Sequence, residues 1–250
     1  LNVRAEYGLT GNTRFASNMG TFYYSSAAYQ DISAIARVNV PNTHLKPEKN
    51  DYFSLSAEYV HERFSVSVNA FYNNIRDMID YNTIATGDKA MEQYGHKEVR
   101  QRDNIAEAKV HGINVSANAY LGAGFNLSGG YTHLNTQDVE LEQPIDKSIK
   151  NAYNINAQWA HSWKIYRLNI NLNGRINSKR FSKSYGYAPE YQLWDLNTRH
   201  SFNLKSVIIE PGCGMENLFD YMDDRPYNSN YATLTPGRSF YISLSLKFKS

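Results

Sequence analysis

Residues 240–248 alternate strictly between apolar and polar side chains. The even positions are Phe240, Ile242, Leu244, Leu246 and Phe248, and the odd positions are Tyr241, Ser243, Ser245 and Lys247. In a pleated strand successive side chains point to opposite faces, so the segment has one apolar and one polar face. Nine residues is also about the length that a tilted strand needs to cross the hydrocarbon of a bilayer. The segment predicts a membrane-crossing β-strand.

The same alternation recurs earlier, in pairs of segments joined by short turns. The pairs lie at 53–59 and 64–72, 113–121 and 125–131, 153–159 and 166–172, and 194–202 and 207–219. Pro211, Gly212 and Gly214 interrupt the last segment, which predicts a bulge or kink there. With an opening strand at 1–9, the sequence predicts about ten strands.

The connections between the pairs are long, in contrast to the turns within them. They span about 11–51, 83–102, 138–149, 181–190 and 221–236. Short turns on one side and long loops on the other are typical of a bacterial outer-membrane barrel. Aromatic residues close to strand ends fit the girdles that such barrels place at the membrane interfaces, with packing in a core as the alternative. These aromatics are Tyr59, Tyr72, Trp159, Trp163 and Trp194.

Composition agrees with a barrel whose strands each have one wet face. The mean hydropathy is −0.58 and Tyr occurs 20 times. The sequence has no run of 18 apolar residues and therefore predicts no membrane-spanning helix. The net charge of +2 is scattered, so we expect no nucleic-acid partner. The single Cys213 excludes an internal disulfide, and we interpret it as an inert small residue rather than a reactive thiol. The chain opens at Leu1 without an apolar signal segment, which favours a processed chain or a fragment.

Five short motifs resemble the C-terminal part of the TonB-dependent outer-membrane receptors. They are Leu45-Lys46-Pro47-Glu48-Lys49-Asn50, Phe71-Tyr72-Asn73-Asn74-Ile75-Arg76-Asp77-Met78-Ile79, the stretch from Asn104 to His111-Gly112-Ile113-Asn114, Glu216-Asn217-Leu218-Phe219-Asp220, and Pro236-Gly237-Arg238. Each is weak alone, and Asn114 replaces the family's usual Glu. All five occur in the family's order, each at its expected strand or loop.

The resemblance implies an all-β fold, with residues 1–250 forming about ten antiparallel strands of a 22-stranded transmembrane barrel. It further implies a multi-pass protein of the outer membrane, whose partners are the bilayer, the remaining strands and a plug domain absent from this chain. TonB would act through that plug. A ten-strand barrel that closes by itself is the architectural alternative. The family's barrel also ends on an aromatic, which predicts that Phe248, supported by Tyr241 and Leu246, belongs to the assembly signal, although Lys249 and Ser250 depart from that habit.

The function that the resemblance implies is active uptake of a scarce metal chelate: a ferric siderophore, haem or cobalamin. The alternatives are a passive porin or adhesin barrel, or an importer of glycans or peptides. We expect no enzyme and no cofactor, because no catalytic constellation is visible. His61-Glu62 lacks the second His of a zinc protease motif, since Ser65 stands there.

Two weaker chemistries depend on the loops. An outer-membrane protease could recruit Asp223, Asp224, His133 and His96, although charges at a barrel rim are usually solvated. Asp223 and Asp224 could bind calcium, but two adjacent carboxylates lack the further oxygen ligands that calcium takes.

Tyrosine and histidine in the long loops are the candidate ligand-binding residues. They are Tyr23, Tyr24, Tyr29, His44, Tyr94, His96, Tyr185, Tyr187, Tyr227 and Tyr231. Tyrosine offers a rigid, broad contact surface with a hydroxyl, which suits a flat or amphipathic ligand. His44 or His96 could ligate haem iron. The alternative is that the tyrosines pack loops on one another and the histidines are ordinary surface residues.

Overall fold

The computed structural model describes residues 1–11, 23–25, 37–183, 185–223 and 235–249, and within them the chain is almost entirely antiparallel β-structure. Ten strands form one continuous path in the order β1-β4-β5-β6-β7-β8-β9-β12-β13-β14. Their bounds are Asn2–Gly11 (β1), Lys49–Val60 (β4), Phe64–Thr86 (β5), Glu98–Gly122 (β6), Phe125–Asp138 (β7), Asn151–Trp163 (β8), Tyr166–Asn177 (β9), Tyr191–Asn203 (β12), Val207–Glu216 (β13) and Ser239–Phe248 (β14). The predicted count of about ten is confirmed.

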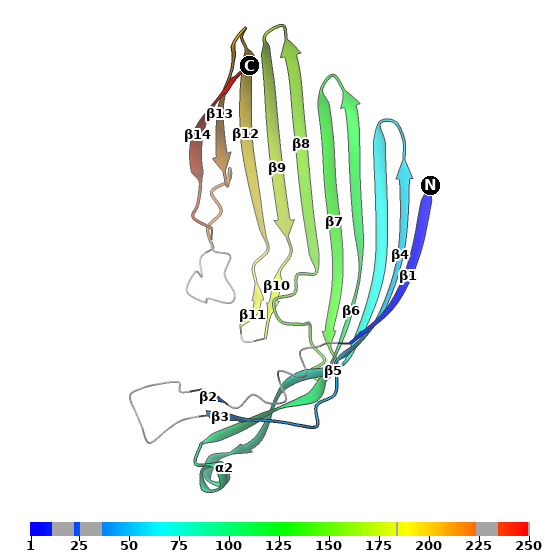
Figure 1. Cartoon of the computed structure of the whole chain (residues 1–250), viewed down its shortest axis with the longest axis vertical. Coiled ribbons are helices and arrows are strands. Elements are labelled where there is room, and N and C mark those ends of the chain that lie inside the picture. Colours follow the sequence, from blue (N-terminus) through cyan, green and yellow to red (C-terminus); the bar gives the residue numbers. More distant parts are fainter. Residues whose placement is uncertain (12–22, 26–36, 184, 224–234, 250) are drawn as a thin grey trace.

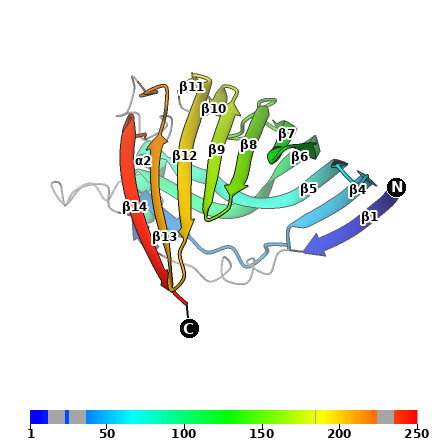
Figure 2. The ribbon, with the colours of Figure 1, turned by 90° about the horizontal axis from the view of Figure 1, so that it is seen from above.

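Short turns join the strand pairs at one end of the sheet, and the longer connections lie at the other (Figure 1). The shorter elements belong to the long-loop end, and four of them are strands: β2 (Tyr23–Ser25), β3 (Arg37–Val40), β10 (Arg180–Ser182) and β11 (Gly186–Ala188). The fifth is the helix α2 (Gly87–Tyr94). Seen from the short-turn end, the sheet curls into an open arc whose edges are β1 and β14 (Figure 2).

The strand register gathers the predicted apolar residues on one face of the sheet. Tyr7 lies opposite Phe53, which in turn lies opposite Tyr72 on β5. Towards the other edge, Phe202 lies opposite Ile209, and Ile209 opposite Leu246. This apolar face is the convex one, and its side chains are exposed in the described chain, up to 89% for Ile242. Such exposure suits a surface that meets lipid rather than water.

The concave face carries the other half of each strand, rich in Asn and Ser. Neighbouring side chains bond to each other across strands: the Ser67 and Ser116 hydroxyls lie 2.7 Å apart, and the Thr132 hydroxyl donates to Asn114 Oδ1 at 2.9 Å. Asn156 Nδ2 donates to the side-chain oxygens of Asn171 and Asn173, both at 2.6 Å. A polar wall of this kind lines a water-filled or protein-filled lumen.

Aromatic residues at the strand ends stack on the convex face. Trp163 and Tyr166 lie 5.6 Å apart between ring centroids across the β8–β9 turn, and Tyr166 is 5.0 Å from Phe202. At the long-loop end, Tyr131 and Tyr153 stack at 4.7 Å. Trp163, Phe202 and Tyr153 are exposed and none of the five is buried, which fits the interfacial girdles predicted from the sequence better than packing in a core.

The ladder between β12 and β13 is interrupted at Glu210 and Pro211, as the sequence predicted, but the predicted bulge is absent. The register of β13 with β14 runs without a shift from Val207 to Glu216, and the register with β12 is the same on both sides of Pro211. Gly214 instead makes room for a ring: a Cβ there would lie 2.3 Å from Tyr241 Cζ. The glycine is therefore required by the close approach of a side chain from the next strand. The strand ends at Glu216 rather than Phe219, because Asn217 adopts a φ of 51°.

The prediction that residues 83–102 form a loop was wrong. β5 and β6 continue through it as a paired ribbon, joined by α2 at the tip. Register shifts between Ile75 and Met78, and between Thr83 and Ala85, break the alternation that marks the rest of each strand. We call the part of this hairpin beyond Asp77, residues 78–104 together with β3, the arm. Figures 1 and 2 show it leaving the sheet and bending across the open side of the arc.

Candidate functional site

The arm leaves the sheet at a junction built from three of the sequence motifs. Asp77 has a φ of 55°, and the backbone turns there. Asn104 Nδ2 donates to the carbonyl oxygens of Asp77 (2.6 Å) and Lys46 (2.9 Å), and its Oδ1 accepts the Lys46 N–H at 2.7 Å. Glu48 Oε1 accepts the N–H of Ile79 at 2.9 Å. The motifs at 45–50, 71–79 and 104–114 therefore fix the direction of the arm.

A second junction joins the motifs at 216–220 and 236–238. Asn217 is 4% exposed, its Nδ2 donates to the Tyr221 carbonyl at 2.7 Å, and its N–H donates to Asp195 Oδ1 at 2.9 Å. Asp220 Oδ1 accepts the Arg238 N–H at 2.8 Å, and Gly237 has a φ of 71°. Both junctions hold backbone at the long-loop end of the strands, so the motifs position the loops.

The arm has two chemically different faces. Val38 on β3, Ala90 on α2 and Val99 on β6 form a small buried core, with exposures of 2%, 0% and 0%. β3 runs parallel to β6, with Val38 opposite Val99 and Arg37 opposite Glu98. Because successive residues of a strand lie on opposite faces, Arg37 and Glu98 are on the face opposite the buried core. Figure 1 shows α2 at the end of the arm away from the barrel strands.

That opposite face carries arginine, and we call it the arginine face. Its described members are Arg37, Asn39, Tyr81, Glu98, Arg100 and Arg102. Glu98 accepts from Arg37 Nε at 2.8 Å and from Arg100 Nε at 2.5 Å. The guanidinium of Arg102 lies 4.6 Å from the centre of the Tyr81 ring, and its Nη2 donates to the Tyr81 hydroxyl at 3.2 Å.

The charges on the arginine face do not cancel. Hydrogen bonds from Arg37 and Arg100 lower the pKa of the Glu98 carboxyl, against the opposing effect of its burial. Glu98 is therefore ionised at neutral pH and balances one of the three guanidinium groups. The face keeps a positive excess next to an aromatic ring, an arrangement that binds anions bearing flat rings.

The structure distributes the predicted ligand residues over the long-loop end without collecting them into one pocket. Tyr23 and Tyr24 lie on β2, which pairs with β3 of the arm, and Tyr94 and His96 lie at the tip of the arm. Tyr187 lies on the β10–β11 hairpin, 5.4 Å from Phe181 between ring centroids, and Tyr185 is in the turn of that hairpin. His44 is exposed near the junction, where its N–H donates to Asn42 Oδ1 at 2.9 Å. Tyr29, Tyr227 and Tyr231 lie outside the described residues.

The residues considered for a protease or a calcium site are not brought together. His133 lies on β7 within the sheet, where its Nδ1 is 2.8 Å from Asn151 Oδ1, whereas His96 follows α2. Asp224 lies outside the described residues. Within the part of the chain that the structure describes, no three His, Cys, Asp or Glu side chains group as metal ligands. No described helix is long and apolar enough to cross a membrane.

The assembly residues lie on two faces of β14. Leu246 and Phe248 are on the convex face, 52% and 82% exposed, whereas Tyr241 covers Gly214 on the concave face. Lys249 donates to the Leu204 carbonyl at 2.9 Å and ties the end of the strand to the β12–β13 turn. A role of these residues in assembly stays a prediction.

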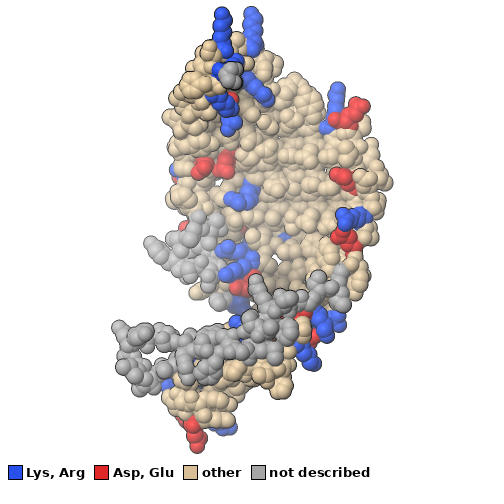
Figure 3. All heavy atoms as spheres, viewed as in Figure 1, with Lys and Arg blue, Asp and Glu red and all other residues tan. Residues whose placement is uncertain are grey.

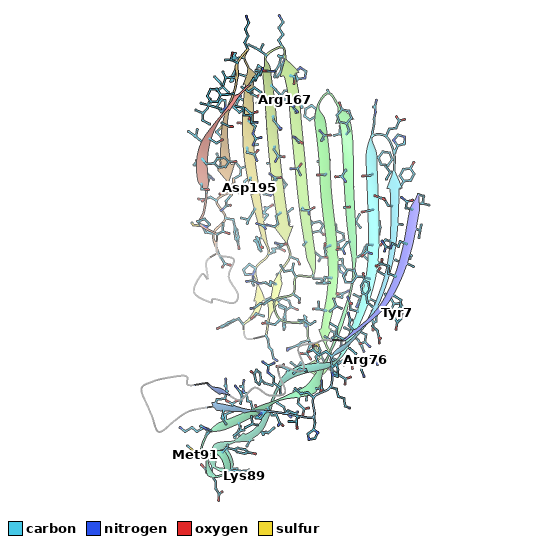
Figure 4. The ribbon with its side chains drawn as sticks, in the orientation of Figure 1. Tyr7, Arg76, Lys89, Met91, Arg167 and Asp195 are labelled. Carbon is cyan, nitrogen blue, oxygen red and sulfur yellow. The ribbon has the colours of Figure 1, made fainter. Side chains whose placement is uncertain are left out.

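Sequence reasoning missed the arginine face because it interpreted 83–102 as a loop. The signal was present: Glu98, Arg100 and Arg102 recur at every second position, as they do on one face of a strand. Figure 4 shows Arg76 where the arm begins, with Lys89 and Met91 at its far end. Arg76 bonds to Asp51 on the neighbouring strand β4.

Comparison with known proteins agrees with this architecture. The family model described as "TonB dependent receptor-like, beta-barrel" matches residues 1–218. A probable TonB-dependent siderophore receptor, PiuA, of Acinetobacter baumannii is 24% identical over 98% of this chain and 34% of its own length. The ferric enterobactin receptor PfeA of Pseudomonas aeruginosa (the G324V mutant) superposes with a TM-score of 0.70 at 19% identity, over 99% of this chain and 38% of that one. The ferric preacinetobactin receptor BauA of A. baumannii gives 0.67 at 18% identity, over 98% and 34%.

The chain belongs to the TonB-dependent receptor β-barrel family, as the five motifs indicated. Its fold is a ten-stranded part of such a transmembrane barrel. It spans about a third of the length of the curated relative that it matches.

Proposed function

We propose that this chain forms part of an outer-membrane receptor that takes up a ferric chelate of the siderophore type. Family membership supports a TonB-dependent receptor, and relatives named as siderophore or ferric enterobactin receptors favour siderophores over haem or cobalamin. The remaining barrel strands, an interior plug and TonB are partners that the proposal adopts from the family.

The arginine face is the observation that carries the proposal. Two of its three guanidinium groups, those of Arg37 and Arg100, bond to one carboxylate, Glu98, and the third, that of Arg102, lies over the Tyr81 ring. Guanidinium donors match pairs of acceptor oxygens, and a ferric tris-catecholate presents phenolate oxygens on flat rings with a net negative charge. The arm bends over the open side of the arc, so a ligand bound there lies at the mouth of the barrel.

The test is uptake of radiolabelled iron by cells with and without the whole natural coding sequence of the protein. Iron would be supplied as an anionic ferric tris-catecholate or as an uncharged ferric trihydroxamate. We expect uptake of the tris-catecholate that stops when a protonophore collapses the inner-membrane gradient. Uptake that continues after collapse would support the passive porin alternative, and uptake of neither chelate would refute the proposal.

The double substitution Arg37→Ala and Arg100→Ala addresses the arginine face directly. Each charge-assisted hydrogen bond to the ligand is typically worth about 1.5–3 kcal/mol, so binding should weaken by roughly one to two decades for each bond lost. Lys89→Ala on α2 is the matched control, because it removes a positive charge from the tip of the same arm. Equal weakening by the control would indicate general electrostatic attraction rather than a site.

The tyrosines of the first long loop are a second proposed contact. Aromatic contacts are worth about 0.5–1.5 kcal/mol each beyond burial, so replacing Tyr23, Tyr24 and Tyr29 with Ala should weaken binding by roughly one to three decades. Whole-cell binding of the labelled chelate measures this. Unchanged affinity in the triple variant would remove these residues from the proposed site.

A further inference from the structure

The concave wall of the sheet is divided into sectors of different charge. The sheet segments 64–73, 112–122, 125–136 and 151–163, on β5 to β8, contain no Asp, Glu, Lys or Arg. On both sides of them the concave face is charged. The charged positions are Arg4, Glu6 and Glu58 on β1 and β4, and Arg167, Arg175, Asp195, Arg199, Glu210, Glu216 and Lys247 on β9 to β14. Figure 3 shows this face, with charges in a column over β9 to β13 and along the β1 edge, and uncharged atoms between them.

The uncharged sector also contains a groove. Its volume is about 360 Å³, and small or polar side chains of β5 to β8 line most of it, with Arg175 of β9 at its border. Ser67, Ser116, Gly130 and Ala152 leave the space open because their side chains are short or absent. The groove crosses the sheet from Ser67 on β5, one strand of the hairpin that carries the arm, to Asn177 on β9.

The polar side chains of the uncharged sector largely satisfy each other. Ser67 bonds to Ser116 and Thr132 to Asn114, and Gln158 Nε2 donates to Asn169 Oδ1 at 3.2 Å. A wall of paired amides and hydroxyls stays wet but offers a solute no strong fixed charge. Conduction past a wall requires contacts weak enough for the solute to leave each one.

The flanking sectors differ in that they carry fixed charges, and some of these charges pair with each other. Glu210 accepts from Lys247 Nζ at 2.6 Å and from the Ser201 hydroxyl at 3.3 Å, and Arg4 lies 2.5 Å from Glu6. Charged side chains hold a facing surface in one register through directional hydrogen bonds. A body that fills the barrel would be held by these sectors and not by the uncharged one.

From this division we infer that the uncharged sector of β5 to β8 is the wall along which the ligand passes through the barrel. The inference rests on the proposed uptake function and adds the route of the ligand. Binding takes place at the arm, and the chelate then moves down the concave side of the same hairpin. The flanking charged sectors keep the interior body in place.

Single cysteines on the two kinds of wall test the route. In the whole receptor carrying Cys213→Ser, Ser116→Cys puts a thiol in the groove, and Ser245→Cys puts one in the charged sector opposite Glu210. Each thiol is modified in cells with maleimides of increasing size. Binding and uptake of the labelled ferric tris-catecholate are then measured separately, and resistance of the folded receptor to SDS shows that each variant has assembled.

We expect large adducts at Ser116→Cys to leave surface binding unchanged and to slow uptake by about tenfold or more, equivalent to about 1.4 kcal/mol in barrier height. The same adducts at Ser245→Cys should slow uptake much less. Normal uptake with the largest adduct at Ser116→Cys, or equal slowing at both positions, would overturn the inferred route. Absence of chelate binding in the unmodified receptor would instead refute the proposed function, so the two failures are distinguishable.

Discussion

The arm and the barrel sheet share two strands, β5 and β6, yet they are stabilised in opposite ways. Beyond Asp77 the hairpin has a buried apolar core at Val38, Ala90 and Val99, and its charged residues are on the surface. On the barrel side of Asp77 the same two strands have no such core among the described residues, and their apolar side chains are exposed on the convex face. Two continuous strands therefore pass from a structure suited to lipid to one suited to water.

The change occurs within a few residues, and backbone irregularities mark it. The register shifts at Ile75 and Met78 and the positive φ of Asp77 coincide with the first charged side chains of β5. A bulge bends a strand and increases its twist, and here it turns the arm out of the sheet. The comparison teaches that hydrogen bonding alone does not define the membrane part of a strand. The membrane part is defined by the surroundings of each face, which are lipid on one side and water on the other.

The largest expected effect comes from placing a charge on the convex face of the sheet. Val115→Arg on β6 should destabilise the barrel by about 2–4 kcal/mol, because a charged group near the middle of a bilayer loses its hydration. Denaturant unfolding in detergent or lipid measures the loss. The control is Ser116→Arg at the next residue, whose side chain lies on the concave face. Equal destabilisation by both would contradict the assignment of faces.

Crowding in the sheet should cost more than strain in the arm. A Cβ at Gly112 would lie 2.3 Å from the His133 carbonyl oxygen, so Gly112→Ala should destabilise by about 1–3 kcal/mol. Gly129→Ala, whose nearest atom is 3.2 Å away, is the matched control in the sheet. At Gly95 in the arm the space is open, and only its φ of 71° opposes a side chain, at about 1–2 kcal/mol. Thermal unfolding of the three variants ranks them by loss of stability. A Gly112→Ala variant as stable as the wild type would show that the neighbouring strands move apart easily.

Removing the Asn104 hydrogen bonds at the junction between the two regions should loosen the arm and leave the sheet intact. Asn104→Ala deletes three hydrogen bonds to the backbone of Lys46 and Asp77, a local loss of about 1–2 kcal/mol after water replaces them. Limited proteolysis should then cut faster within the arm, while resistance to SDS stays unchanged. Thr83→Ala on the exposed ribbon serves as the control. If cleavage of Asn104→Ala proceeds at the wild-type rate, other contacts hold the junction.

Acid should produce the smallest effect, confined to the arm. Arg37 and Arg100 lower the folded-state pKa of Glu98 below its unfolded value of about 4.3. The stabilisation is therefore present at neutral pH and is lost as the pH falls through the lowered folded-state pKa. A partly exposed pair contributes about 0.2–1 kcal/mol. Hydrogen exchange in β3 should show this loosening, and a Glu98→Gln variant with the same pH profile would argue against it.

How much the sequence predicted also differs between the two regions. In the sheet, alternation located all ten crossing strands and their faces, because each strand has one face in lipid and one in the lumen. In the arm it failed, because register shifts interrupt β5 and because the alternation that remains on β6, at Glu98, Arg100 and Arg102, marks a charged face and not an apolar one. The glycines near Pro211 misled for a related reason. Gly214 responds to the Tyr241 ring on another strand, which local sequence cannot show.

The sequence by itself determined the strand count, the apolar and polar faces, the motifs and the family. Those features are local or periodic, and the bilayer enforces the period on every crossing strand. Only the tertiary structure decided that the arm exists, that Arg37 meets Glu98 and Arg100, and that the motif residues form two junctions. These facts depend on pairing between segments far apart in the chain, such as β3 with β6, and on the curl of the sheet that places an uncharged wall between two charged ones.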